Sequence, residues 1–207
     1  ADLTAVLSLF EQGTLFGSLI QIPEGLVEKL PALSQWLEQT ATTQDLLSSK
    51  SAESALVFVR IAQVLGQKYD QVVSNPPYLG TKGMITKLRD HLNNSFPDSK
   101  YDLYSSFIEQ AAYYLITTNG IVSMITMQGW MFLARFQLLR KSLLRKMTIS
   151  SVIHLGPRAF SQISGEVVQT TAFSLIGKSI KEYKPTFKKL TDGDETKKII
   201  NFYNEQY

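Results

Sequence analysis

Cysteine is absent from the 207 residues of this chain, and histidine occurs only at His91 and His154. Without thiols, the chain can form neither disulfides nor thiolate zinc sites. The two imidazoles lie far apart in sequence and outside any ligand spacing, so we expect no metal site. A lack of cysteine is typical of a reducing compartment, and we therefore predict a cytoplasmic location.

Long hydrophobic runs are also missing from the sequence. No stretch approaches the roughly 18 apolar residues that a membrane helix needs, so we expect no membrane contact. The start, Ala1-Asp2-Leu3, has neither the basic region nor the apolar core of a signal peptide, and it lacks an initiator methionine. We interpret the chain as a processed product or as a piece of a longer protein.

Apolar residues make up 44% of the sequence, and this proportion is enough to build a globular core. The net charge of +3 favours anionic partners only weakly. Basic residues gather between residues 82 and 100 and again between 135 and 146. Each is most simply a solvated helix residue, although the first group could also approach nucleic-acid phosphates.

The order of apolar patterns predicts an α/β protein. Residues 1–47 indicate short helices broken at Pro23 and Pro31, and a helix from Ser51 to Gly66 follows. We expect strands at 69–74, 121–127, 149–155 and 167–176, and helices at 103–115 (capped by Asp102) and 132–147. We expect residues 79–100 to form a long loop with at most one helical turn. Strands that alternate with helices predict a parallel, doubly wound sheet, and the fourth strand, with no helix before it, should join antiparallel.

These patterns suggest three parts of the chain. We expect a helical segment at 1–50, a catalytic α/β region at 51–177 and a polar extension at 178–207 that holds loop and a terminal helix. The most informative stretch lies at residues 72–80 (VVSNPPYLG), where an apolar strand ends on an amide, two prolines and an aromatic ring.

The strand end at 75–78 has the composition of a site for an aromatic amine. Proline has no backbone N–H, so nearby carbonyls stay available as acceptors, and Asn75 adds a side-chain carbonyl. Two acceptors that hold the protons of an NH₂ group would free its lone pair for attack, and Tyr78 offers a flat surface for stacking. Asn-Pro-Pro is also a common turn sequence, and that simpler interpretation stays open for the tripeptide alone.

The run YDQVVSNPPYLG at residues 69–80 resembles the catalytic motif of the γ-type N6-adenine-specific DNA methyltransferases. Residues 101–109 (YDLYSSFIE), 120–125 followed by Trp130, and 154–160 (HLGPRAF) are similar to later segments of that family. The combination is closest to the BREX or phage-growth-limitation methyltransferases, with type II restriction-associated enzymes next. The resemblance spans roughly residues 50–177.

This resemblance implies a partial Rossmann-like fold of S-adenosylmethionine-dependent methyltransferases, namely the catalytic half of the sheet. It implies that Asn75, Pro76, Pro77 and Tyr78 form the catalytic motif, with the amine held by Asn75 and the Pro76 carbonyl. Tyr78 and Phe160 would enclose an adenine flipped out of double-stranded DNA. Phe107 would border the adenine of S-adenosylmethionine, although its place on an apolar helix face also fits a core residue.

The sequence departs from the family pattern before residue 75. Residues 1–74 contain no glycine-rich cofactor turn, and residues 11–20 (EQGTLFGSLI) fit a later element of the cofactor half. Target-recognition sequence is also missing. We therefore expect the remainder of a parent methyltransferase as partner and expect the isolated chain to be inactive. We also expect an exposed edge at strand 69–74 that permits self-association.

Two other functions remain open at this point. A protein glutamine N-methyltransferase would present an amide NH₂ to the same motif, although residues 103–107 and Phe160 suit the DNA-modifying branch better. A non-catalytic DNA-binding or complex-forming module with the methyltransferase fold would explain the missing cofactor turn.

Overall fold

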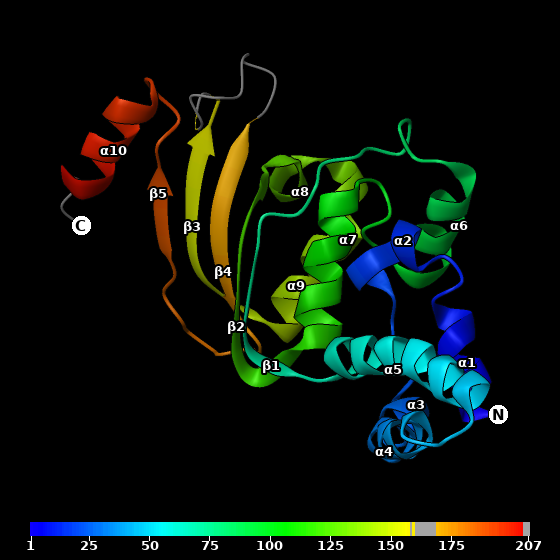
Figure 1. The fold of residues 1–207 in the computed structure, drawn as a ribbon. Coiled ribbons are helices and arrows are strands. Elements are labelled where there is room, and N and C mark those ends of the chain that lie inside the picture. Colours follow the sequence, from blue (N-terminus) through cyan, green and yellow to red (C-terminus); the bar gives the residue numbers. More distant parts are fainter. Residues whose placement is uncertain (158, 160–168, 205–207) are drawn as a thin grey trace. The chain divides into compact units, whose positions relative to one another are not determined.

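The computed structural model describes residues 1–157, 159 and 169–204, which divide into two compact units, Ala1–Lys68 and Tyr69–Tyr207 (Figure 1). The predicted boundary at residue 50 falls inside one helix of the first unit, and the second unit begins at the first strand. In the part of the chain that the structure describes, no helix is long and apolar enough to cross a membrane.

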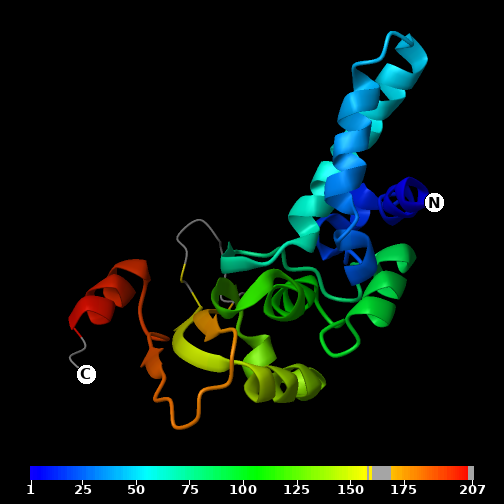
Figure 2. The ribbon, with the colours of Figure 1, turned by 90° about the horizontal axis from the view of Figure 1, so that it is seen from below.

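The first unit consists of helices, and its two longest lie side by side (Figure 2). Its elements are α1 (Asp2–Leu9), α2 (Gly13–Phe16), η1 (Gly17–Leu19), α3 (Glu24–Val27), α4 (Leu30–Ala41) and α5 (Leu46–Gly66). The predicted breaks lie near both prolines, because Pro23 directly precedes α3 and Pro31 follows the break between α3 and α4. Pro31 lies in the first turn of α4, where a missing N–H is tolerated. Helix α5 begins before Ser51 because Asp45 accepts a hydrogen bond from the Leu47 N–H.

The second unit is a five-stranded mixed sheet with helices against one face. Its elements are β1 (Tyr69–Ser74), α6 (Thr86–Ser95), α7 (Leu103–Gln110), the π-helical turn η2 (Ala111–Leu115), β2 (Ile116–Met127), α8 (Gly129–Phe132), η3 (Ala134–Phe136), α9 (Gln137–Lys146), β3 (Thr148–Gly156), β4 (Thr170–Ile176), β5 (Thr186–Lys189) and α10 (Glu195–Asn204). The strand order is β1-β2-β4-β3-β5. Only β4 runs against the others, so the predicted antiparallel fourth strand is confirmed.

Three predictions for this unit are wrong in detail. The expected loop 79–100 contains helix α6, whose buried Leu88 and Leu92 are spaced one turn apart among polar residues. The expected helix 132–147 is divided into α8, η3 and α9. The polar tail contains the short strand β5, which pairs with β3 and has too few apolar residues to be recognised from its pattern.

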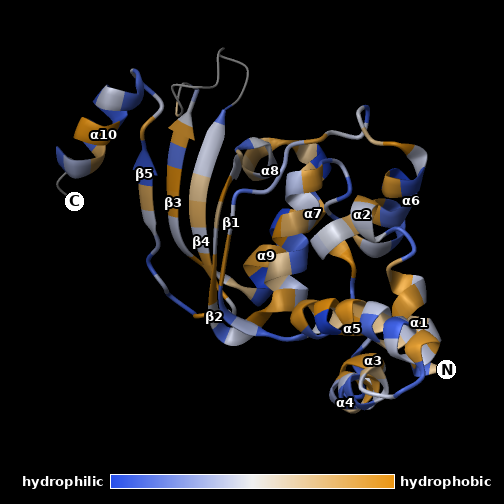
Figure 3. Ribbon diagram, viewed as in Figure 1, coloured by the Kyte–Doolittle hydropathy of each residue, from blue (hydrophilic) through white to orange (hydrophobic). Residues whose placement is uncertain are grey.

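The core of the second unit lies between the sheet and helices α7 and α9. Alternate residues of β2 and β4 point into it, among them Val122, Met124 and Phe173. They meet Ile108 of α7 and Leu139 of α9, both fully buried. Figure 3 shows hydrophobic residues on α9 and along the strands beside it. This packing holds β1 and β2 in register, and their ends carry the predicted site.

Gly177 permits a close approach of two strand ends, and this leads to a testable prediction. Its N–H donates to the Gly120 carbonyl at 2.8 Å, and an added Cβ would lie 2.4 Å from the Thr117 carbonyl oxygen. Because that oxygen belongs to the backbone, we expect Gly177→Ala to destabilise the chain by about 1–3 kcal/mol in urea unfolding. Gly80→Ala is the control, since its Cβ would make only an ordinary 3.5 Å contact. Equal stability of the two variants would contradict the prediction.

Candidate active site

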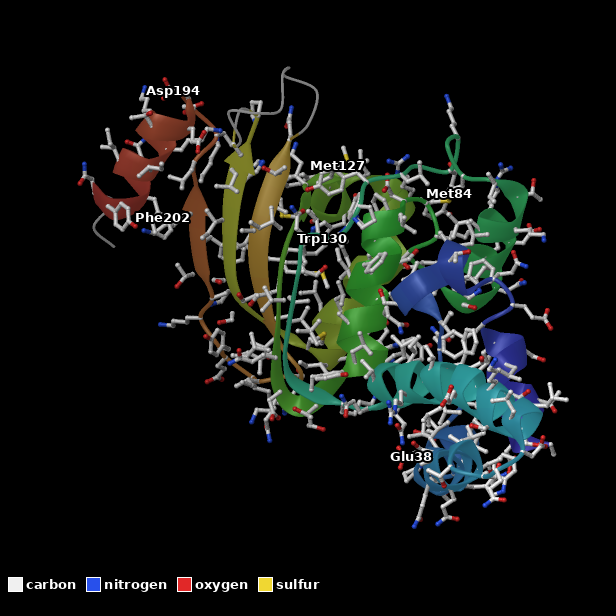
Figure 4. The ribbon with its side chains drawn as sticks, in the orientation of Figure 1. Glu38, Met84, Met127, Trp130, Asp194 and Phe202 are labelled. Atoms are coloured by element: carbon white, nitrogen blue, oxygen red, sulfur yellow. The ribbon has the colours of Figure 1, made fainter. Side chains whose placement is uncertain are left out.

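The predicted site lies at the edge of the sheet where the parallel strands end. Ser74, the last residue of β1, pairs with Met124 of β2, so Asn75 emerges beside the carboxyl end of β2. Figure 4 labels Met127 and Trp130 at this end of β2. Strand β3 ends at the same edge and β4 begins there. In open α/β sheets, ligands bind beyond these carboxyl ends.

Asn75 and Tyr78 face one another within the NPPY segment. The Tyr78 hydroxyl donates to Asn75 Oδ1 over 3.5 Å, the outer limit of a hydrogen bond. Asn75 is exposed, Tyr78 is half-buried and Pro76 is buried. Burial raises the pKa of the Tyr78 phenol, which therefore stays neutral near pH 7. Such a long contact leaves the amide oxygen able to accept from a better-placed donor.

The sequence did not identify Tyr104 or Asp102 as site residues. The buried ring of Tyr104 meets the ring of Tyr78 nearly at a right angle, with 5.9 Å between centroids. Asp102 occupies the predicted N-cap position of α7, but its side chain makes no hydrogen bond to the helix. Its Oδ1 instead accepts from the Leu79 N–H at 3.0 Å. Leu79 and Asp102 are 23 residues apart, so a local sequence pattern does not predict this hydrogen bond.

The two remaining predicted contacts both stay predictions. Phe107 lies half-buried on α7, and its contact with the cofactor is not tested by its burial. Phe160 lies outside the described residues, so its predicted stacking role stays a prediction.

A polar group continues along the same edge of the sheet. His154 Nε2 hydrogen-bonds Gln128 Oε1, and Gln128 Nε2 donates to Gln169 Oε1. Burial, reinforced by Lys189 and Lys198, lowers the pKa of His154, so its imidazole is neutral near pH 7. Phe132 packs against that ring at 5.7 Å between centroids. The edge thus presents uncharged amide, imidazole and phenol groups.

A pocket of about 400 Å³ adjoins Asn75 on the sheet face opposite α7 and α9. Hydroxyl and apolar side chains form its lining, and none of the lining residues is charged. A second pocket of about 410 Å³ lies between α8, α9, β3 and β5 and is mainly apolar. It includes none of the predicted site residues, so only the first pocket is placed to accompany chemistry at Asn75.

The sequence of the chain is similar to those of known proteins. The chain is 41% identical over 202 residues to the adenine-specific methyltransferase BrxX of Escherichia coli O9:H4 (strain HS), covering 98% of this chain and 17% of BrxX. It is 34% identical to the adenine-specific methyltransferase PglX of Lacticaseibacillus casei (strain Zhang), covering 95% of this chain and 16% of PglX. The chain thus spans about a sixth of the length of these curated relatives.

The fold of much of the chain is also found in solved structures. The DrdV–DNA complex, determined by cryo-electron microscopy, matches 76% of this chain and 18% of its own with a TM-score of 0.50 and 16% identity. The mixed sheet is a partial Rossmann-like fold of the S-adenosylmethionine-dependent methyltransferase class. Residues 13–160 match the model of the Eco57I restriction-modification methylases. The chain belongs to that family.

Proposed function

We propose that this chain is the catalytic part of an enzyme that transfers a methyl group from S-adenosylmethionine to adenine N6 in DNA, in restriction-modification or phage defence. The observation behind this proposal is that Asn75 Oδ1 lies beyond the carboxyl end of β1 and, among the described residues, accepts only the long hydrogen bond from Tyr78. Family membership and the printed activities of BrxX and PglX support the same reaction.

The residues at 75–78 would act by orienting the amine. Asn75 Oδ1 accepts one N–H of the adenine amine, and the Pro76 carbonyl accepts the other. The nitrogen lone pair then points out of the ring plane and forms the new N–C bond as the S–C bond of the donor breaks. The methylated nitrogen would then release one proton to water, and no covalent enzyme intermediate would form. Uncharged groups suffice for this orientation, and the Tyr78 phenol beside Asn75 is itself neutral near pH 7.

The residues present fit only part of the cofactor, which supplies an electrophilic methyl group when bound. The pocket beside Asn75 has hydroxyls and apolar groups for a sulfonium and its chain, and half-buried Phe107 offers a ring to the adenine. The lining of this pocket has no carboxylate for the ribose and no glycine for an anion-binding turn. We assign those contacts to the remainder of the parent methyltransferase.

The proposed DNA substrate is double-stranded, with the target adenine flipped into the site. Tyr78→Ala should weaken capture of an extruded base because stacking on an aromatic contributes about 1–3 kcal/mol. The measurement is the fluorescence of 2-aminopurine at the target position, with the full-length enzyme. Phe160→Ala should act likewise. Tyr183→Ala, at an exposed tyrosine of the polar extension, is the control. Unchanged fluorescence with Tyr78→Ala would contradict the stacking role.

The outer edge of strand β1 could bind a further partner. Among the described residues, β1 pairs only with β2, and Val73 in it is 77% exposed. An unpaired edge of this kind can join another chain, so we retain either a strand of the parent enzyme or a second copy as its partner. Action on chromosomal or phage DNA places the enzyme in the cytoplasm.

The test is incubation of the full-length enzyme with radiolabelled S-adenosylmethionine and either duplex DNA or a glutamine-bearing protein substrate. We expect label in the DNA. Label in the protein alone would identify a glutamine methyltransferase. DNA binding without transfer to either substrate would identify a non-catalytic module.

A further inference from the structure

The segment that directly follows NPPY is fastened to the start of α7 by backbone pairing. The Leu103 N–H donates to the Leu79 carbonyl at 3.0 Å, and the Thr81 N–H donates to the Tyr101 carbonyl at 3.3 Å. Gly80 and Asp102 form an isolated antiparallel bridge between these bonds. A turn closed by the Gly83 N–H and the Gly80 carbonyl follows directly, so this short ladder and the turn fix the position at which the catalytic segment ends.

One side chain completes the ladder. Leu79 donates its N–H to Asp102 Oδ1 at 3.0 Å, and Asp102 is only 7% exposed. Burial raises the pKa of this carboxyl, and the N–H groups of Leu79, Tyr104 and Leu103 together with the charge of Arg135 oppose that rise. Burial disfavours the charged form of an acid. If Asp102 only capped α7, serine or asparagine would cap the helix without that cost. The hydrogen bond of the Asp102 side chain goes to the backbone next to Tyr78, and the N–H groups of Leu103 and Tyr104 in the first turn of α7 act on the same carboxylate.

The ring of Tyr78 is supported from the same first turn of α7. Tyr104, which is 1% exposed, meets it at 85°. Phe136 lies against the Tyr104 ring at 6.0 Å. Gly129 gives it room, since a Cβ there would lie 3.1 Å from the Tyr104 hydroxyl. Gly129 and Phe136, which follow β2, thus fix the position of the Tyr104 ring. The Tyr104 ring in turn contacts and positions the ring of Tyr78 after β1.

We infer that Asp102 and Tyr104 are positioning residues, which set the backbone and the ring of Tyr78 for the reaction at Asn75. Neither need touch the substrate. The inference rests on the proposed function for its consequence in catalysis, although the ladder itself is independent of the reaction. Asp102 and Tyr104 are two residues apart and hold the end of β1 in two ways. Asp102 binds the Leu79 backbone N–H, and Tyr104 contacts the ring of Tyr78.

The test uses the full-length enzyme with Asp102→Ala, Asp102→Asn and, as matched control, Asp90→Ala at an exposed aspartate of α6. A displacement of about 1 Å in a catalytic group lowers the rate about 100-fold, so we expect a loss approaching that in kcat for Asp102→Ala. KM for DNA and cofactor should stay unchanged. Asn keeps an oxygen acceptor for the Leu79 N–H, so Asp102→Asn should restore kcat to near the wild-type value, as should the control.

For the ring, Tyr104→Leu should lower kcat while Tyr104→Phe retains it, because only the leucine variant removes the aromatic edge. Melting temperatures identify any variant that has lost its fold. A kcat of folded Asp102→Ala equal to that of wild type would overturn the inference, as would equal losses in the Ala and Asn variants.

Hydrogen exchange separates this inference from the proposed function. The Leu79 amide should exchange about tenfold faster or more in Asp102→Ala than in wild type and Asp102→Asn, whatever reaction the enzyme performs. If the wild-type enzyme does not methylate DNA but this difference is seen, the proposed function fails and the positioning role stands. If exchange is the same in all three proteins, the positioning role fails.

Discussion

Asn75→Ala in the full-length enzyme is expected to lower the rate of methyl transfer to DNA by about 100- to 1000-fold, the usual effect of removing one preorganised polar group that acts on the transition state. Asn75 Oδ1 is the acceptor at the end of β1, and its only described hydrogen bond is the 3.5 Å contact from Tyr78. Alanine keeps the turn but leaves one amine proton without a partner. The measurement is single-turnover transfer from labelled S-adenosylmethionine.

DNA affinity should change little in this variant because Asn75 has no charge for a phosphate. Asn94→Ala is the matched control, since Asn94 is an exposed asparagine on α6 of the same unit. It should transfer methyl groups at the wild-type rate. If Asn75→Ala keeps more than about a tenth of the wild-type rate, the role assigned to its amide is wrong.

Phe136→Ala is expected to produce the largest loss of stability, about 3–5 kcal/mol, as is usual for removal of a buried aromatic ring. Phe136 is fully buried and its ring lies 6.0 Å from those of both Tyr101 and Tyr104. The cavity would open beneath the start of α7 and the first turn of α9. Urea unfolding of the variant, followed by circular dichroism, measures the change.

Phe132→Ala provides the comparison for this substitution. Phe132 belongs to α8 of the same unit but is 63% exposed, so its loss should change the free energy of unfolding by less than about 1 kcal/mol. A similar destabilisation in both variants would show that the ring of Phe136 does not hold this part of the core. Because Phe136 supports Tyr104, its alanine variant should also lose activity.

The strands could be predicted from sequence because their signals are local. Val72, Val122 and Val152 each belong to a short apolar run of β-branched residues, and all three runs became strands. The antiparallel direction of β4 followed from the lack of a helix before it. Asn75 and Tyr78 could be singled out from sequence because they belong to one short motif directly after a strand, and in the structure the Tyr78 hydroxyl lies 3.5 Å from Asn75 Oδ1.

The remaining features depend on contacts between distant segments. Strand β5 has the sequence Thr-Phe-Lys-Lys, and only its pairing with β3 stabilises an extended conformation there. Helix α6 forms around two leucines in an otherwise polar stretch. Asp102 had a sound local interpretation as a helix cap, and the Leu79 N–H competed successfully for its carboxylate. A tertiary hydrogen bond of this kind cannot be read from spacing.

Mass spectrometry of nucleosides tests the central claim most directly. Duplex DNA is incubated with the full-length enzyme and S-adenosylmethionine, digested to nucleosides and compared with DNA treated with the Asn75→Ala variant. The account predicts N6-methyldeoxyadenosine after treatment with the wild-type enzyme and almost none after treatment with the variant. Methylation of cytosine instead, or equal amounts of N6-methyldeoxyadenosine from both enzymes, would contradict it.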